Sequence, residues 1–571
     1  MARTVTSTVR LLDALEVFRG DPRVQVVFWV DERSRFGRGV RDLLSRVGAR
    51  VVARHELSAL DVGLVLAASE NADVGVVDAP GVVLPHGVGF HKYLRDVPSG
   101  PVRLSGVVPQ RLASGRETVM VVTSHRQRAQ LQSALPGAGT STVVVRDPFF
   151  DRLRASRTLR DRYRRAMGVR RGRRLVVVSS TWGQESLWSA WQDLPARLLA
   201  ELPSDEYMVA AILHPNVWAG HGPWQVRTWL ADALDAGLLL VPADQGWQQA
   251  LVSADIVIGD HGSVTFYAAA LGLPLLLGTF GDEVVPGTPL AELGALVPRL
   301  RWDRSLLPQV TRALSGPAPA PYTAVAQAAF GVGEPGPFAD LGQFLYGLLG
   351  LTPPAHRPPQ AWAYADLTAP PVASFTVFSH TDADGAAVLR RHPAAVSGAA
   401  SRVGEPAPSP APSASRHLAV YDDETDVGRR QSASTLVCRD VLDREDANEW
   451  LALHRGRHLI TAVPTRRGIL VADRYGGLFL VTVNPRSGPN TWFEPMHAAA
   501  VVHHLLCKGT TRPCEQGGEA DDKSLDDHDR RATAGVTVPV KVAGRGCLIR
   551  LTPIRSTTQS ATPPRPDAAS G

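Results

Sequence analysis

The sequence has very little lysine, and it has no cysteine before position 438. Lysine occurs only at positions 92, 508, 523 and 541, so the basic side chains are almost all arginine, which we interpret as a GC-rich coding bias. The first 437 residues therefore have no thiol for disulfide bonds, metal thiolates or covalent catalysis. A disulfide-bonded scaffold is excluded.

Long hydrophobic runs are also absent. The most apolar stretch, 268–277, contains Pro274 and is much shorter than the roughly 20 residues that cross a bilayer. Residues 1–18 are interrupted by Arg10, Asp13 and Glu16, so we expect an amphipathic helix there and no signal peptide. The sequence predicts a cytoplasmic protein, with peripheral contact at the inner face of the plasma membrane as a further hypothesis.

The remaining composition is that of a globular protein. Hydrophobic residues make up 44% of the chain and charged residues 20%, values that support buried cores rather than disorder. The formal net charge is +6. A length of 571 residues is typical of two or three folding units.

Short β-branched runs alternate with helical patterns in two consecutive stretches. In the first stretch we expect strands at 24–30, 49–53, 62–68 and 73–78 and a helix at 38–48. In the second we expect strands at 175–180, 207–213, 238–241, 255–259 and 274–278, with helices near 186–201, near 223–236 and from about 263. This rhythm predicts an α/β fold with two doubly wound, Rossmann-like domains facing one cleft, where ligands bind at strand carboxyl ends.

The composition changes beyond residue 350. Segments 352–360 and 405–415 are rich in proline and are typical of linkers. The clearest later element is a hairpin over 468–483, in which Gly476 and Gly477 supply the tight turn. We expect a smaller C-terminal α+β domain of unknown role and a mostly disordered tail.

Two histidines follow predicted strands. His86 precedes Gly87 in a loop, where an imidazole of near-neutral pKa is suited to act as a general base, and a plain loop histidine is the alternative. His214 ends the run 207–213, and Pro215 stops its continuation. Capping of the backbone is the alternative role for His214.

A strand, a polar turn and a helix follow one another directly over 255–277. Gly262 and Ser263 fall at the expected helix N-terminus, where free N–H groups and the helix dipole favour phosphate. An ordinary serine N-cap is the alternative.

Taken together, these motifs resemble the CDP-glycerol glycerophosphotransferase family, the teichoic-acid polymerases and primases of GT-B glycosyltransferase architecture. That family has a His-Gly pair after the first sheet, a linker helix, a Thr-Trp pair, a His-Pro pair and an Asp-Tyr-Ser-Ser turn. The matching positions are His86-Gly87, Asp161 to Val169, Thr181-Trp182, His214-Pro215 and Asp260-His261-Gly262-Ser263, so the resemblance covers roughly 80–300.

The resemblance implies a division of roles and of the chain. His86 would deprotonate an acceptor hydroxyl, and His214 would share the catalytic work by contacting the donor pyrophosphate. Thr181 and the turn Asp260, His261, Gly262 and Ser263 would bind the donor phosphates. The expected parts are an acceptor-side domain at 1–150, an Arg-rich linker helix at 151–174, a donor nucleotide domain at 175–350, a partly structured linker region at 351–417, the small α+β domain at 418–512 and the tail at 513–571.

The implied reaction is attack of a hydroxyl on the β-phosphorus of a nucleotide-activated phospho-alditol, CDP-linked in the family. It delivers the phospho-alditol to a cell-envelope polymer or lipid-linked acceptor and requires no metal or cofactor. Two departures leave alternatives: His261-Gly262 replaces Tyr-Ser, and Gly183 stands where an arginine is common. The alternatives are a nucleotide-sugar glycosyltransferase or UDP-GlcNAc 2-epimerase-like enzyme, and a degenerate GT-B scaffold that binds ligand without catalysis.

Residues 151–174 hold eleven arginines and two aspartates, which leaves the rest of the chain net negative. Such a patch suits a polyanionic acceptor or an anionic membrane, with Arg160, Arg164, Arg165, Arg170 and Arg171 as the candidate contacts. A solvated helix face is the alternative. No nucleic-acid-binding motif accompanies the charge, so nucleic acid is not an expected partner.

Two further patterns invite a metal interpretation that we do not adopt. The triplet Asp382-Ala383-Asp384 lies outside the cleft domains. His503, His504, Cys507 and Cys514 match no standard zinc spacing, so we expect helix packing there.

Overall fold

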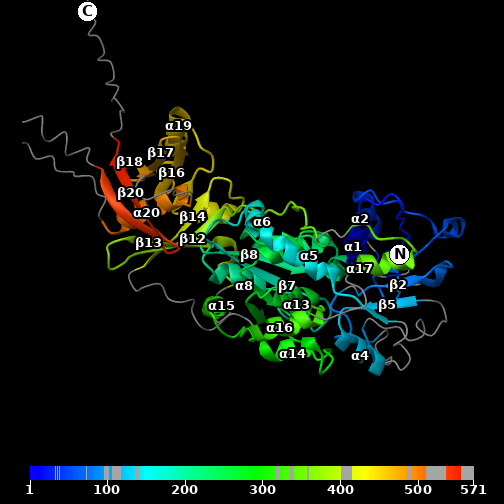
Figure 1. Cartoon of the computed structure of the whole chain (residues 1–571). Helices are drawn as coiled ribbons and strands as arrows, with labels where there is room; N and C mark the ends of the chain where they lie inside the picture. The colour runs from blue at the N-terminus through cyan, green and yellow to red at the C-terminus, as the bar shows by residue number, and fades with distance from the viewer. Residues whose placement is uncertain are drawn as a thin grey trace, which may run out of the picture. The chain divides into compact units, whose positions relative to one another are not determined.

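The computed structural model describes residues 1–31, 34, 37, 39–72, 74–85, 87–95, 102–105, 118–134, 142–316, 320–333, 340–355, 359–399, 414–484, 492–509 and 535–554 (Figure 1). The chain divides into two compact units. Unit 1 comprises Met1–Leu202, Glu206–Pro371 and Gly398–Ala407, and unit 2 comprises Pro203–Asp205, Val372–Ser397 and Pro408–Gly571.

The first sheet of unit 1 has four described strands in the order β1-β2-β5-β6, all parallel. They are β1 (Val65–Ala67), β2 (Gly81–Val83), β5 (Thr118–Val122) and β6 (Thr142–Val144). The parallel sheet and a strand within 62–68 are confirmed. The expected strands at 24–30 and 49–53 form only isolated bridges, and 73–78 contains a 3-10 turn at Val74–Val76.

The physical reason for these differences is burial. A continuous apolar run predicts a strand only when both faces are covered. Of the described residues 74–78, only Val74 is buried, and Val76 and Val77 are partly exposed.

The second sheet of unit 1 has five described strands in the order β11-β10-β7-β8-β9, again all parallel. They are β7 (Arg174–Ser180), β8 (Tyr207–Leu213), β9 (Leu239–Val241), β10 (Ile256–Gly259) and β11 (Leu275–Leu277). Every residue of β8 is buried, as expected for an interior strand of a covered parallel sheet. All five expected strands of this stretch are confirmed, whereas the placement of two domains around one cleft stays a prediction.

Helices connect and cover these strands. In unit 1 they are α1 (Val5–Ala14), α2 (Val40–Arg46), α4 (His125–Ala134), α5 (Pro148–Ser156), α6 (Arg160–Ala166), α7 (Leu187–Ala190), α8 (Leu194–Glu201), α9 (Pro215–His221), α10 (Pro223–Trp229), α11 (Ala231–Asp235), α12 (Trp247–Ser253), α13 (Ser263–Ala270), α14 (Pro289–Leu296), α15 (Leu306–Ser315), α16 (Ala320–Ala329) and α17 (Leu341–Leu348). The expected helices at residues 1–18 and 38–48 are confirmed as α1 and α2. Among the described residues, no helix is both long and apolar enough to cross a membrane.

A buried carboxylate joins three of these helices. Asp147 is the N-cap of α5, and its side chain accepts hydrogen bonds from Arg10 Nη2 of α1 at 2.8 Å and from the Tyr267 hydroxyl of α13 at 2.9 Å. The Phe149 N–H donates to the same carboxylate at 2.8 Å. Asp147 is fully buried, and burial also raises the pKa of Tyr267, which keeps its hydroxyl protonated as a donor.

Unit 2 is a closed barrel of nine described strands in the order β12-β13-β19-β20-β18-β17-β16-β15-β14. The strands are β12 (Ser374–Thr381), β13 (Ala387–Pro393), β14 (Ser415–Tyr421), β15 (Thr435–Val437), β16 (Ile460–Thr465), β17 (Gly468–Asp473), β18 (Leu478–Val483), β19 (Val536–Val542) and β20 (Arg545–Pro553). The helices are α18 (Val427–Ser432), α19 (Arg444–His454) and α20 (Pro495–Cys507).

The barrel differs from the expected small α+β domain at 418–512. It begins inside the expected linker region, with β12 and β13, and it ends inside the expected tail, with β19 and β20. The hairpin at 468–483 is confirmed, with Gly476 at φ +106° in its turn. The acidic run of the tail and most of segment 405–415 lie outside the described residues.

Helix α20 fills the barrel. Its residues Met496 to His504 are all buried, and they share one hydrophobic core with residues from all nine strands. A helix that is buried on every side must satisfy its polar side chains internally. The His503 ring stacks on His417 at 3.8 Å between centroids, and His504 contacts the hydroxyls of Ser379 and Thr381.

We predict that Asp147→Asn lowers the free energy of unfolding of unit 1 by about 3–5 kcal/mol, because it leaves the buried Arg10 charge unpaired. Urea unfolding followed by tryptophan fluorescence measures the change. Asp303→Asn, which removes an exposed ion pair with Arg301, is the matched control and should leave the curve in place. Equal stability of Asp147→Asn and wild type would contradict the role given to the carboxylate.

We also predict that acid weakens unit 2 through His503. Burial, with a smaller effect of His504, lowers the pKa of His503 to about 4, so the unfolded chain binds this proton more readily than the folded one. The stabilising effect of neutral His503 is complete above the unfolded pKa near 6.5 and is lost as the pH falls towards 4.

His503 alone is expected to lower the unfolding free energy of unit 2 by about 2 kcal/mol between pH 7 and pH 5. Burial lowers the pKa values of His417 and His504 too, so these two histidines add to the loss. His503→Phe should reduce this loss, whereas His454→Phe on α19 controls for the removal of an imidazole and should leave it unchanged. An identical pH dependence in His503→Phe and wild type would refute the assignment.

Candidate functional site

A tight turn connects β10 to α13 at the carboxyl edge of the second sheet. The strand ends at Gly259, and the helix begins at Ser263. A Cβ atom on Gly259 would lie 2.1 Å from the Thr265 Oγ1, and one on Gly262 would lie 2.9 Å from the Asp260 Oδ1, so only glycine fits this turn. Among the residues that the structure describes, no side chain caps α13, so its first N–H groups have no described side-chain acceptor.

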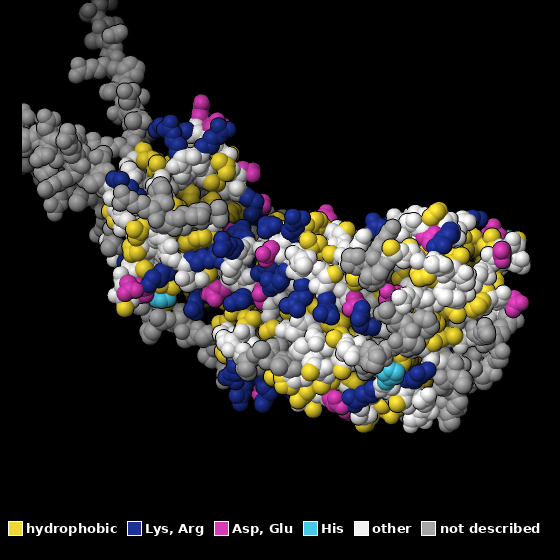
Figure 2. Space-filling view, viewed as in Figure 1, with side chains coloured by type: hydrophobic (Ala, Val, Ile, Leu, Met, Phe, Trp, Pro, Cys, Tyr) yellow, Lys and Arg dark blue, Asp and Glu magenta, His cyan; other side chains and the backbone are white. Residues whose placement is uncertain are grey.

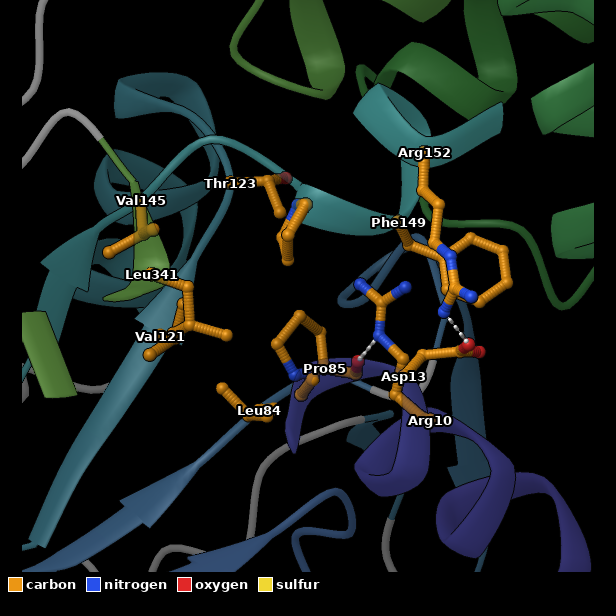
Figure 3. A pocket seen from close by; sticks show the side chains of 12 residues that line it. Arg10, Asp13, Leu84, Pro85, Val121, Thr123, Val145, Phe149, Arg152 and Leu341 are labelled. Atoms are coloured by element: carbon orange, nitrogen blue, oxygen red, sulfur yellow. Dashed lines mark hydrogen bonds and ion pairs between the residues drawn. The ribbon is translucent and has the colours of Figure 1, made fainter. Parts of the chain in front are cut away.

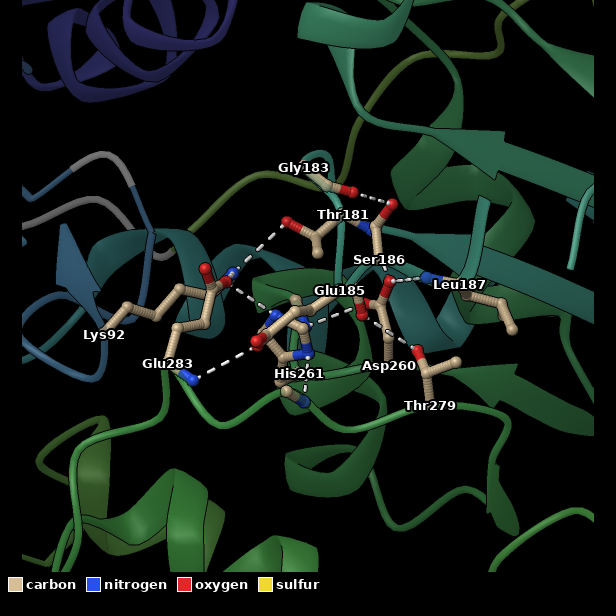
Figure 4. Close-up of polar contacts among 12 residues, drawn as sticks. Lys92, Thr181, Gly183, Glu185, Ser186, Leu187, Asp260, His261, Thr279 and Glu283 are labelled. Carbon is tan, nitrogen blue, oxygen red and sulfur yellow. Dashed lines mark hydrogen bonds and ion pairs between the residues drawn. The ribbon is translucent and has the colours of Figure 1, made fainter. Parts of the chain in front are cut away.

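Asp260 organises this turn rather than facing a ligand. Its carboxylate is fully buried and accepts hydrogen bonds from the N–H groups of Thr181 (2.8 Å), Leu187 (2.9 Å) and Gly262 (2.9 Å). The Ser180 hydroxyl adds a fourth contact at 3.2 Å. The carboxylate therefore ties the loop after β7 to the turn after β10 (Figure 4).

His261 is held as a neutral side chain. Its Nδ1 accepts a hydrogen bond from the Gly281 N–H at 3.2 Å, which requires an unprotonated Nδ1. The proton therefore sits on Nε2, which donates to the Glu283 Oε1 at 2.8 Å. His261 is thus a buried donor aimed at Glu283.

Lys92 reaches the same carboxylate from the first half of unit 1. Its Nζ lies 3.1 Å from the Glu283 Oε1 and 3.5 Å from the Thr181 Oγ1 (Figure 4). Burial opposes ionisation of Glu283, but the hydrogen bond from His261 and the charge of Lys92 together lower the pKa of this carboxyl. Glu283 is therefore ionised at neutral pH.

Residues 87–93, which we call the strap, bring Lys92 to the turn. The Val88 N–H donates to the Ser263 Oγ at 3.3 Å, and a Cβ on Gly87 would lie 2.4 Å from that oxygen. Phe90 in the strap has φ +62°, an unusual conformation for a bulky residue. Backbone hydrogen bonds from Tyr93 to Glu283 and from Val285 to His91 then fix the strap to the loop after β11.

His214 lies at the next strand end, as expected. It is the N-cap of α9, and its Nδ1 accepts a hydrogen bond from the Asn216 N–H at 3.1 Å. This bond places the proton on Nε2. The His214 N–H donates to the Ser180 carbonyl, which positions His214 beside the strand that leads to Thr181.

The structure thus brings Thr181, Asp260, His261, Gly262 and Ser263 together, with His214 at the adjacent strand end. His86 lies outside the described residues, although its neighbours Pro85 and Gly87 are described. The role of His86 stays a prediction.

A second concave feature lies at the carboxyl edge of the first sheet, beside the segment that leads to His86 (Figure 3). Its wall includes Arg10, Asp13, Pro85, Thr123 and Arg152 among apolar side chains. Burial raises the pKa of Asp13 to about 6 in spite of the Arg152 guanidinium, which donates to it at 2.8 Å.

The arginines of 151–174 do not act as one group. Arg160 and Arg164 donate to the Asp255 carboxylate at 2.8 and 2.9 Å and to nearby carbonyl oxygens, so these two side chains hold α6 against the start of β10. Arg165, Arg170 and Arg171 are exposed. Figure 2 shows basic side chains around α6 with acidic ones among them. Contact with an acceptor or membrane stays a prediction.

The two patterns for which we expected no metal site are now placed. The Asp382 Oδ1 accepts hydrogen bonds from the N–H groups of Asp384 and Ala386, and Lys541 pairs with both aspartates. The Cys507 Sγ lies 3.7 Å from the His503 Nδ1, and Cys514 lies outside the described residues. Within the described ranges, no three His, Cys, Asp or Glu side chains are arranged to hold a metal ion.

Lys92 and Glu283 are site residues that the sequence analysis missed. The signal for Lys92 was its isolation, since it is the single lysine before position 508. Glu283 had no local signal, because its contacts come from residues distant in sequence.

A scan against protein-family models and a search of curated proteins found no match. Among solved structures, a UDP-GlcNAc 2-epimerase from Neisseria meningitidis is 13% identical with a TM-score of 0.38, covering 61% of this chain and 97% of that one. The wall teichoic acid polymerase TagF is 11% identical with a TM-score of 0.40, covering 61% and 86%. WaaG, a glycosyltransferase of lipopolysaccharide biosynthesis, is 14% identical with a TM-score of 0.30, covering 61% and 98%.

We predict that Asp260→Asn mainly lowers the stability of the fold, whereas Ser263→Ala mainly weakens ligand binding. Asp260→Asn turns an amide N–H towards backbone donors and should lower the unfolding free energy of unit 1 by about 3 kcal/mol. Ser263 is exposed and its Oγ accepts a hydrogen bond from the Val88 N–H at 3.3 Å, so Ser263→Ala should lower the unfolding free energy by no more than about 1 kcal/mol while weakening phosphate binding. Thermal unfolding and pyrophosphate titration of both variants measure the two effects, and equal stabilities would refute the distinction.

Proposed function

We propose that the protein is a GT-B-type transferase that uses a nucleotide-activated donor. In the form closest to the sequence motifs, it moves a phospho-alditol from a CDP-linked donor to a cell-envelope polymer or lipid-linked acceptor. The observation that carries the proposal is the turn at Asp260–Ser263. A helix start that no described side chain caps, an exposed serine hydroxyl and the Lys92 cation lie together there.

These groups suit the two phosphates of a nucleotide diphosphate. Backbone N–H groups at a helix start and the positive end of its dipole favour an anion. Lys92 adds a full charge, which strengthens hydrogen bonds to phosphate oxygens. The His214 Nε2, which carries the proton, is suited to donate to the leaving phosphate as charge develops on it.

The acceptor side of the proposal rests on the sequence resemblance. His86 would accept the proton of the attacking hydroxyl, and the bond from that oxygen to the β-phosphorus would form as the bond to the nucleoside monophosphate breaks. The proton moves to His86, and the electron pair leaves with CMP. Neither metal nor cofactor enters this scheme.

One observation favours a second candidate, a sugar-nucleotide enzyme. The turn presents a buried imidazole and a glycine where the family has Tyr-Ser, so it offers two hydroxyls fewer to a phospho-alditol. Such a site suits a UDP-sugar as donor.

We predict that the full-length protein binds one CDP-alditol saturably. Isothermal titration with CDP-glycerol, CDP-ribitol, UDP-GlcNAc and CDP tests this, with the Ser263→Ala, His214→Ala double variant in parallel. The variant should weaken binding at least about tenfold, because two hydrogen bonds to phosphate oxygens are lost.

The outcomes distinguish the candidates. Selective binding of UDP-GlcNAc would replace the phosphotransferase proposal with a sugar-nucleotide enzyme. If none of the four nucleotides binds, a scaffold without catalysis is favoured. If the double variant binds as tightly as the wild type, the location of the site is refuted.

A further inference from the structure

Two donors converge on a single carboxylate oxygen beside the turn. The Lys92 Nζ lies 3.1 Å and the His261 Nε2 lies 2.8 Å from the Glu283 Oε1. A cation and a fixed N–H that meet at one anionic oxygen form the arrangement that binds a phosphate oxygen. Glu283 therefore satisfies groups that are chemically suited to an anionic ligand.

The exposures of the three side chains indicate which one can leave. The His261 side chain is 0% exposed, the Lys92 side chain 21% and the Glu283 side chain 30%. His261 is also fixed through its second nitrogen by the Gly281 N–H. Glu283 is therefore the member of the cluster that solvent reaches best.

The backbone of Glu283 is held independently of its side chain. Its N–H donates to the Glu185 Oε2 at 3.2 Å, and its carbonyl accepts from the Tyr93 N–H at 2.8 Å. Release of the carboxylate then needs a change of side-chain rotamer that breaks its contacts with Lys92 and His261. No loop has to open.

Repulsion between negative charges favours displacement of the Glu283 carboxylate by a phosphate group. Glu185 already places a second carboxylate beside Glu283, and Lys92 is a cation that contacts both Glu283 and Thr181. A phosphate dianion entering this position would be repelled by Glu283 until the carboxylate turns away.

We propose that the Glu283 carboxylate competes with the phosphate of the ligand for the contacts with Lys92 and His261. It holds Lys92 and His261 in this structure, and a phosphate group displaces it and takes both contacts. This inference rests on the proposed function and names its ligand class: groups with enough negative charge to displace a carboxylate, such as a diphosphate. When the product leaves, Glu283 recovers Lys92 and favours release.

The test is pyrophosphate binding to the full-length chain, measured by titration calorimetry. Glu283→Gln removes the competing charge and should bind pyrophosphate roughly 3- to 10-fold more tightly than wild type, the range expected for a partly exposed ion pair plus like-charge repulsion. Lys92→Met should bind at least about tenfold more weakly, because a charged hydrogen bond is lost. Glu283→Asp, with a shorter reach, should also bind more tightly.

Glu292→Gln is the matched control. Glu292 makes a comparable ion pair with Arg126, at 2.6 Å, between the same two halves of unit 1. Its removal should leave pyrophosphate affinity unchanged. A similar gain in Glu292→Gln would mean that any lost carboxylate raises affinity by general charge, and would overturn the proposal.

The remaining outcomes are decisive. If wild type binds pyrophosphate and loses binding in Ser263→Ala, but both Glu283 variants bind equally or more weakly, the competitor role is refuted and the phosphate site stands. If wild type binds no pyrophosphate and Lys92→Met behaves identically, the phosphate site of the proposed function fails instead. Thermal melts identify any variant that does not fold. If Glu283→Gln does not fold, Glu283→Asp tests the same prediction.

Discussion

The geometry of unit 1 depends on the hydrogen bonds that the buried Asp147 carboxylate accepts. This carboxylate receives Arg10 from α1, Tyr267 from α13 and the first turn of α5 at the same time. The ion pair is almost fully buried, so breaking one partner would leave a charge in the interior. Because α13 starts at the candidate phosphate turn, the contact that joins these helices also sets the direction in which α13 leaves that turn.

The candidate site uses charge in two different ways. Asp260 is a buried carboxylate whose acceptor positions are filled by backbone N–H groups and a hydroxyl, so it serves as internal scaffolding. Glu283 is a partly exposed carboxylate paired with a lysine and a histidine, so it can change partners. The carboxylate of Asp260 thus has a structural role and that of Glu283 an exchangeable one, and this difference follows from their surroundings.

Much of unit 1 was predictable from the sequence because its central strands are buried on both faces. β7, β8 and β10 are continuous apolar runs, and the turn with Gly262 and Ser263 follows β10 directly. The runs at 24–30 and 49–53 were misleading because they lie where only isolated bridges form. Lys92 and Glu283 meet only through the tertiary structure, so no local pattern contained their contact. The barrel was missed for a similar reason: its last strands pair with segments far earlier in the chain.

The order of the barrel strands has a consequence for synthesis on the ribosome. Ala387 of β13 pairs with Val540 of β19, so the barrel closes only when residues on the far side of α20 have emerged. Until then, α20 presents its alanines and valines with no complete wall around them. Unit 1 has both of its sheets available well before that moment. The nascent chain therefore carries a finished α/β unit followed by an open barrel, and the late closure makes unit 2 the part of the chain most exposed to aggregation while it is being made.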